Sequence, residues 1–206
     1  DLKLVTIKDG QNNVVEEKYY RYYTPDNIED EEENIIGFVG AIRMYFDGPS
    51  FTRLKQAVSG WETAADSTVK PYATDYFEYD GTTEQVKLRT SQGGGCSGTC
   101  GGGGLSTVTF GYDTNPDPNY ADDYNTWKYK RTTTYAAVSC TETLYANFAN
   151  QTILEVFTYS GSNWCTFYKY DAEGRQTVQA GPSTIASYSE SHDDLVDWDA
   201  ADSEHV

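Results

Sequence analysis

The sequence predicts a mainly β protein, an antiparallel sheet built from hairpins with one short helical insertion. Strand-like runs rich in Tyr, Thr, Val and Phe recur along the chain, the composition that a pleated surface prefers. Eighteen tyrosines and an aromatic content of 15% supply enough bulky apolar surface to close a core despite the charge. A convincing helical period appears only at residues 50–58, so helix is the minor component.

The chain is expected to open with a hairpin. Residues 2–8 and 14–23 are β-like runs, and the Asp9-Gly10 pair between them is a short-range hairpin signal. The acidic run at residues 29–33 repels itself and is interpreted as a solvated loop. Further strands are expected at residues 75–79, 85–90, 105–112, 126–134, 135–148, 153–159, 164–170 and 175–180.

The helical insertion rests on a short amphipathic pattern. Phe51, Leu54 and Val58 fall at i, i+3 and i+7, and Ser50 precedes them as the expected N-cap. A further helical turn is expected near residues 67–72, limited by Pro71. The spacing therefore predicts helix only within this insertion.

These elements predict a single elongated β domain of residues 1–206. Its parts are an N-terminal hairpin region at 1–48, the helical insertion at 49–73 and a repetitive sheet at 74–206. The chain has 32 acidic and 15 basic side chains, and its net charge of -17 would repel polyanions. Its apolar runs are far shorter than the roughly 20 residues of a membrane-spanning helix. We expect neither nucleic-acid binding nor membrane insertion.

Cysteine usage indicates an extracellular or cell-surface protein. Four cysteines, an even number, fit an oxidising exterior, and the start at Asp1 suggests a processed product or a piece of a longer chain. A local Cys96–Cys100 disulfide is favoured over zinc, which needs four ligands, because both histidines lie near the C-terminus. Cys140 and Cys165 lie in predicted strands and are expected to form a second disulfide, with two reduced, buried thiols as the alternative.

Three segments share a tyrosine-rich strand that ends in Tyr-Asp and then turns: residues 77–81, 110–113 and 167–175. Such recurrence is typical of a repetitive β architecture. The third segment resembles the Rhs/YD-repeat family, whose hallmark is a tyrosine-aspartate strand end followed by a Gly-Arg turn. The matching residues are Tyr168, Tyr170, Asp171, Gly174 and Arg175, whereas the other two segments are degenerate.

This resemblance is to a divergent bacterial group of secreted YD-repeat proteins. It implies a sheet built from hairpins that serves as a surface fibre, an adhesin or a toxin-enclosing shell. It implies no catalysis in the repeats themselves. A full shell needs many repeats, so this chain is expected to be either a fragment of one or a unit completed by other copies.

An uncapped first strand favours completion by other copies. Residues 2–7 carry the apolar side chains of Leu2, Leu4, Val5 and Ile7 at the very end of the sequence. We expect this strand to complete a sheet of the next subunit, which gives a head-to-tail helical homopolymer, a filament or surface fibre.

Sugars are the second expected class of partner. Exposed rings stack on sugar faces while carboxylates take the hydroxyls, which makes the protein an alternative carbohydrate-binding or adhesive module. The candidate rings are Trp61, Trp127, Trp164 and Trp198, although a core position is the more common place for each. Asn150 lies in the acceptor sequon Asn-Gln-Thr and is the candidate for glycosylation.

Motifs for metal binding and catalysis are weak. Asp113, Asn115 and Asp117 alternate as in the first half of a calcium loop, but Pro118 occupies the position that needs Gly and Tyr124 the position of the bidentate Glu. A turn rich in Pro and Asn explains the same residues, so we expect no cofactor, with calcium as the alternative. The sequence lacks the common nucleophile, phosphate-loop and zinc-protease motifs, and no enzyme activity is expected.

Overall fold

A computed structural model describes residues 2–92, 105–117, 123–192 and 194–198. The described chain is mainly β, as predicted. It divides into two compact units, Asp1–Val108 and Thr109–Val206, where the sequence predicted a single domain of residues 1–206. The division follows the hydrophobic cores, because the buried clusters of the first unit share no residue with that of the second.

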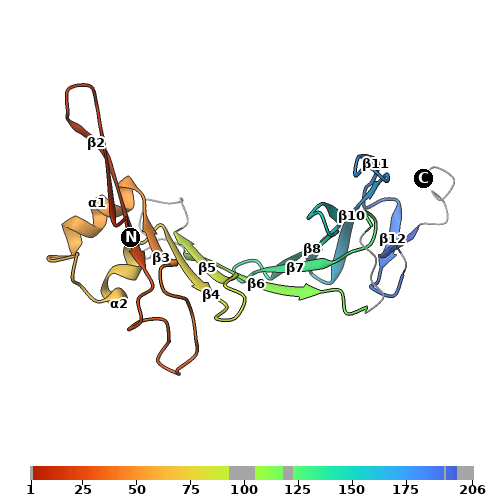
Figure 1. Cartoon of the computed structure of the whole chain (residues 1–206), viewed down its shortest axis with the longest axis horizontal. Helices are drawn as coiled ribbons and strands as arrows, with labels where there is room; N and C mark the ends of the chain where they lie inside the picture. Colours follow the sequence, from red (N-terminus) through yellow and green to blue (C-terminus); the bar gives the residue numbers. More distant parts are fainter. Residues whose placement is uncertain (1, 93–104, 118–122, 193, 199–206) are drawn as a thin grey trace. The chain divides into compact units, whose positions relative to one another are not determined.

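The strands follow one topological rule: from β1 to β11, each strand is hydrogen-bonded to its neighbours in the chain. Figure 1 traces the chain through these strands. The first unit contains β1 (Leu4–Lys8), β2 (Val14–Tyr22), β3 (Ile42–Phe46), β4 (Asp75–Tyr79) and β5 (Val86–Gln92). Strand β6 (Leu105–Thr114) runs from the first unit into the second. The second unit continues with β7 (Tyr129–Tyr135), β8 (Cys140–Ala146), β9 (Thr152–Tyr159), β10 (Ser162–Tyr170) and β11 (Gln176–Ala180).

The helical insertion lies where the sequence placed it. Helix α1 (Gly48–Ala57) is followed by α2 (Asp66–Val69) and a 3-10 turn at Lys70–Tyr72. The N-cap is Asp47 rather than the predicted Ser50, and its carboxylate accepts a hydrogen bond from the Ser50 N–H. Pro49 fits the first turn, where its missing N–H is not needed. Among the described residues, no helix is long and apolar enough to cross a membrane.

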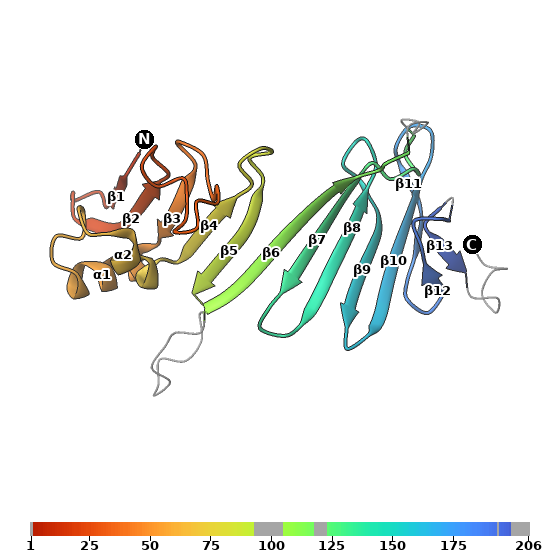
Figure 2. The same cartoon turned by 90° about the horizontal axis from the view of Figure 1, so that it is seen from below.

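The insertion closes the main core of the first unit. Phe51 and Leu54 of α1 are fully buried and belong to one cluster with Met44 and Phe46 of β3. Figure 2 shows α1 and α2 lying over one face of the strands at this end of the unit. The i, i+3 spacing of Phe51 and Leu54 therefore places both side chains on one face of α1, and this face packs against the sheet.

A second, smaller cluster lies under the loop between β2 and β3. Tyr23, Ile36 and Ala41 are buried there, and the acidic segment between them remains exposed, as predicted. Gly37 packs against the ring of Tyr23, where an added Cβ would lie 2.5 Å from ring carbons. Only glycine allows this close approach.

In the second unit, the pleat sorts side chains onto two faces of the sheet. Cys165 and Phe167 of β10 pair with Val156 and Leu154 of β9, and all four are buried. A small two-stranded sheet, β12 (Ile185–Tyr188) with β13 (Val196–Trp198), closes this face. Its strands contribute Ile185 and Val196 to the core, and Leu195, the residue before β13, is buried beside them.

One five-residue hairpin turn recurs through both units. Its first residue is Asp or Asn, whose side chain accepts the backbone N–H groups of the third and fifth residues. The N–H of the first residue donates to the C=O of the fifth, and the fourth residue has a positive φ between 60° and 76°. The four examples are the turns at residues 9–13, 30–34, 147–151 and 171–175.

This turn corrects the predicted repeat pattern. The Tyr-Asp segment at Asp171 forms the turn, and Asp80 begins a version one residue longer, closed by an Asp80 N–H to Gln85 C=O bond. The segment at Asp113 does not turn, because β6 continues through it and its carboxylate lies 3.0 Å from Lys130 Nζ. Strands β3, β12 and β13 were not predicted.

The buried member of this set gives a stability prediction. Asn147 is fully buried, accepts two backbone N–H groups and donates to the C=O of Tyr124 and to Gln151 Oε1. We expect Asn147→Ala to lower the free energy of unfolding by about 3 kcal/mol, because buried donors lose their partners. Urea unfolding followed by fluorescence measures the loss. Asp171→Ala at the same turn position is the control; a loss as large as that of Asn147→Ala would contradict the role of burial.

The three turns that begin with Asp predict that acid destabilises the fold. Hydrogen bonds from the fifth residue of the turn are the largest cause that lowers the carboxyl pKa of Asp9, Asp30 and Asp171. Because the folded pKa lies below the unfolded value of about 3.9, this stabilisation is present at higher pH and lost as pH falls through the folded pKa. We expect urea midpoints to drop below about pH 4, and to drop less steeply in Asp171→Asn. Equal slopes in both proteins would contradict this cause.

Candidate functional site

The first strand has an open edge. In the described part of the chain, β1 pairs with β2 only. The Lys3 C=O accepts the Tyr20 N–H, and bonded and non-bonded pairs alternate along an antiparallel ladder. The N–H and C=O groups of Leu4 and Thr6 therefore point away from β2. This edge presents the donors and acceptors to which a further strand would bind.

The outer half of the β1–β2 hairpin also exposes apolar side chains. We call residues 2–15 the arm; its turn stands clear of α1 and β3 in Figure 1. Five large aliphatic side chains on it are between 41% and 67% exposed: Leu2, Leu4, Ile7, Val14 and Val15. The predicted Val5 is half-buried. Sequence reasoning did not single out Val14 and Val15, although they follow the predicted turn directly.

Ring packing anchors the base of the arm. Tyr19 of β2 is buried, and its ring lies 5.4 Å from Phe46, 5.3 Å from Phe51 and 4.9 Å from Trp61. Strand β2 is therefore core-forming at one end and solvent-exposed at the other.

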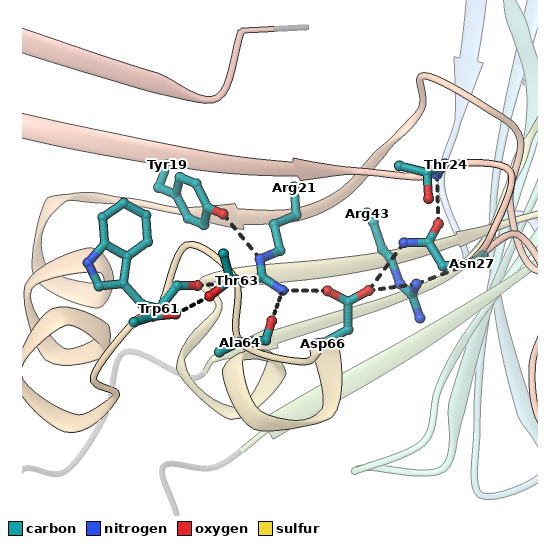
Figure 3. Close-up of polar contacts among 10 residues, drawn as sticks. Tyr19, Arg21, Thr24, Asn27, Arg43, Trp61, Thr63, Ala64 and Asp66 are labelled. Atoms are coloured by element: carbon teal, nitrogen blue, oxygen red, sulfur yellow. Dashed lines mark hydrogen bonds and ion pairs between the residues drawn. The ribbon is translucent and has the colours of Figure 1, made fainter.

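A charged cluster ties the insertion to the same strand (Figure 3). Asp66 of α2 receives Arg21 Nη1 of β2 at 2.7 Å and Arg43 Nη1 of β3 at 2.7 Å on its two carboxylate oxygens. Arg21 also donates to the C=O groups of Trp61 and Ala64. All three charged side chains are at least three-quarters buried. This cluster fixes the insertion against β2 and β3 at the base of the arm.

A second candidate surface lies on the uncovered face of β9 and β10. We call Phe157, Tyr159, Trp164 and Tyr168 the aromatic face. Trp164 pairs with Phe157 in register, and their ring centroids are 5.9 Å apart. Phe157, Tyr159 and Trp164 are between 40% and 49% exposed, while the small β12–β13 sheet packs on the opposite face.

A shallow pocket opens beside these rings. Its volume is about 340 Å³, and it is lined by Gln151, Thr152, Glu155, Tyr168, Tyr170 and Gln176. Glu155 pairs with Thr166 in register, one row from Trp164. None of these described lining residues is basic. The pocket therefore offers rings, a carboxylate and amides, which suit a neutral polar ligand.

The predicted Cys140–Cys165 disulfide is wrong. Both thiols are free and buried. Cys140 on β8 pairs with Tyr159 and Cys165 on β10 pairs with Val156, so β9 separates them and their side chains point to opposite faces. Burial raises the pKa of the Cys165 thiol, which disfavours the reactive thiolate. Cys96 and Cys100 lie outside the described residues.

The calcium candidates are used for other contacts. Asp113 pairs with Lys130, the Asn115 amide donates to the Trp127 C=O, and Asn115 Oδ1 accepts the Asp117 N–H. Among the described residues, no group of three or more His, Cys, Asp or Glu side chains is arranged to hold a metal ion. The described part of the segment resembles the alternative turn more than a metal site.

The remaining predicted site residues are the glycosylation candidate, the tryptophans and the Tyr-Asp motif. Asn150 is exposed at the positive-φ position of its turn. Trp127 is buried, and Trp61 and Trp198 pack against cores, so Trp164 is the exposed member of the predicted tryptophans. Gly174 has a φ of 76°, and an added Cβ there would lie 2.7 Å from the Tyr124 ring. The YD residues therefore build a turn.

Comparisons with family models, curated proteins and solved structures find no match to this chain.

The charged cluster gives a stability prediction for the first unit. We expect Asp66→Ala to lower the free energy of unfolding by about 3 kcal/mol, because two mostly buried guanidinium groups lose their shared carboxylate. Glu173→Ala is the control, since its ion pair with Arg175 is exposed and worth less than about 1 kcal/mol. Urea unfolding measures the stability of both variants. If Asp66→Ala loses no more stability than Glu173→Ala, the stabilising role of the charged cluster is contradicted.

Proposed function

We propose that this chain is a structural subunit that assembles head to tail with copies of itself through the arm. The observation that supports this best is the edge of β1, where unpaired backbone groups and exposed aliphatic side chains occur together. Either feature alone is common on protein surfaces. Their combination is what soluble monomers usually avoid, because it invites strand addition.

Assembly would use main-chain bonds for affinity and side chains for register. The outward N–H and C=O groups of Leu4 and Thr6 would form hydrogen bonds with the open edge of a sheet in the next copy. One such edge is β11, which pairs with β10 only in the described part of the chain. Because the donor and acceptor edges differ, the contact is heterologous, and where its rotation does not close a ring it repeats as a helical homopolymer.

The local charge of β1 suits an acidic partner such as another copy at contact, although the net charge repels copies at a distance. The chain carries a net charge of -17, whereas β1 and the residue before it contribute Lys3 and Lys8. A basic strand edge is attracted to an acidic surface, and every further copy supplies one.

The proposal extends to location and kinship. We propose an extracellular or cell-surface structural role, with no catalytic step, no nucleic acid and no membrane insertion. The recurring turn at residues 171–175 supports kinship with Rhs/YD-repeat proteins, whose hairpins end at a Tyr-Asp pair. A piece of a longer toxin-enclosing shell of that family is the alternative form of the same structural role.

A single proline tests the assembly edge. Thr6→Pro removes an outward N–H and places a ring on the outer side of β1, while the inward bonds of the neighbouring residues remain. We expect the unaltered chain to form long assemblies at micromolar concentration and physiological salt, and Thr6→Pro to remain monomeric. Sedimentation velocity and electron microscopy measure both.

Thr6→Ala is the matched control, because it keeps the N–H and should assemble like the unaltered chain. A chain that stays monomeric at every concentration, or that stops at closed dimers, overturns the proposal. Full assembly of Thr6→Pro would show that the β1 edge is not the contact.

A further inference from the structure

We infer that the aromatic face and its pocket bind a neutral oligosaccharide that lies along β10. This site belongs to the second unit and is distinct from the arm. It assigns a ligand class to exposed side chains of β9 and β10 that the proposed contact through the arm does not use.

The rings form a line rather than a single platform. Trp164 and Tyr168 are separated by four positions on β10 and point to the same face. At about 3.3 Å per residue, their Cα atoms are about 13 Å apart, with Phe157 beside Trp164 on the neighbouring strand. A row of this length matches an extended chain of rings better than one small molecule. Such a ligand would stack its apolar faces on successive side chains.

Polar groups lie between the rings with free hydrogen-bonding capacity. Within the described residues, the side chains of Glu155, Tyr168 and Gln176 form no hydrogen bond or ion pair. Sugar hydroxyls both donate and accept, so they match a carboxylate, a phenol and an amide placed around one pocket. Two other lining residues are already satisfied: Gln151 donates to the Gly174 C=O, and Tyr170 donates to the Thr152 C=O.

The lining residues therefore fall into two sets: those held by hydrogen bonds within the protein form the floor of the pocket, and those without such bonds are available to a ligand. Gln151 and Tyr170 are held in place by their own hydrogen bonds, which fixes the shape of the floor before any ligand arrives. Glu155 and Gln176 come from β9 and β11 on either side of β10, so they flank a ligand that follows this strand.

Charge narrows the ligand to neutral sugars. The described lining residues include one carboxylate, Glu155, and no Lys or Arg. Uronic-acid and sulfated chains would meet an uncompensated negative charge here, and the net charge of -17 adds to the repulsion.

Isothermal titration calorimetry on the Thr6→Pro variant tests the site, because self-assembly is then separated from sugar binding. The probes are cellohexaose, chitohexaose and maltohexaose, with a hexameric polygalacturonate as the charged comparison. We expect at least one neutral hexasaccharide to bind and the polygalacturonate not to bind. Trp164→Ala should weaken binding about tenfold or more through the lost ring contact. Glu155→Gln keeps the size of the side chain and should weaken binding several-fold.

Tyr129→Ala is the control, because Tyr129 is an equally exposed ring on β7 that does not line the pocket. Its affinity should equal that of the parent, and circular dichroism checks the fold of each variant. The inference is overturned if no neutral hexasaccharide binds, or if Trp164→Ala and Glu155→Gln both bind like the parent. It is also overturned if the Thr6→Pro protein dimerises and Trp164→Ala abolishes that dimer, since a second copy then covers this face.

Discussion

Backbone pairing between consecutive strands is the constraint on which this molecule depends. Each hairpin satisfies the inner groups of two strands, so a sheet that follows chain order leaves open groups only at its first and last members. The Asp or Asn turn repeats this geometry, because its side chain binds the N–H groups that the turn frees. A left-handed fourth residue then returns the chain to the ladder.

A sheet of this kind also has two faces, and one covering element closes a core in each unit. In the first unit the helical insertion supplies Phe51 and Leu54, held by the shared carboxylate of Asp66. In the second unit the small terminal sheet supplies Leu195 and Val196. Strand β2 extends beyond the part of the sheet that the helical insertion covers, so its Tyr19 is buried while its Val15 is exposed. The candidate sites are thus the parts of the strands that the covering elements do not reach.

Local patterns in the sequence were enough to predict most of the strands. The Asp9-Gly10 signal and the spacing of Phe51 and Leu54 act over a few residues, and the corresponding hairpin and helix form as expected. Strand β3 was not predicted because Ile42 continues an apolar run, in which Gly40 with its φ of 89° marks the turn. The division into two units escaped because the boundary falls inside β6, where composition does not change.

Features that join residues far apart in the sequence could be recognised only from the pairing of the strands in the structure. A bridge between Cys140 and Cys165 looks reasonable from two predicted strands, but only the pairing with β9 shows that the thiols face opposite sides. The contact of Arg21 with Asp66 spans 45 positions, with no local pattern to indicate it. Alternation along β10 did place Trp164 and Tyr168 on one face, but only the position of the terminal sheet shows that this face is the open one.

The arm combines two opposing forces that act over different distances. Net charge repels copies from afar, yet salt screens this repulsion beyond about 8 Å under physiological conditions. Strand addition acts only at contact, where outward groups of Leu4 and Thr6 and the exposed aliphatic side chains lose water together. In the proposed assembly, charge would therefore set the concentration and salt at which copies approach one another, whereas the edge would set how they join. Under the proposed assembly, the chain would stay dispersed when dilute and would polymerise without any change in its own fold.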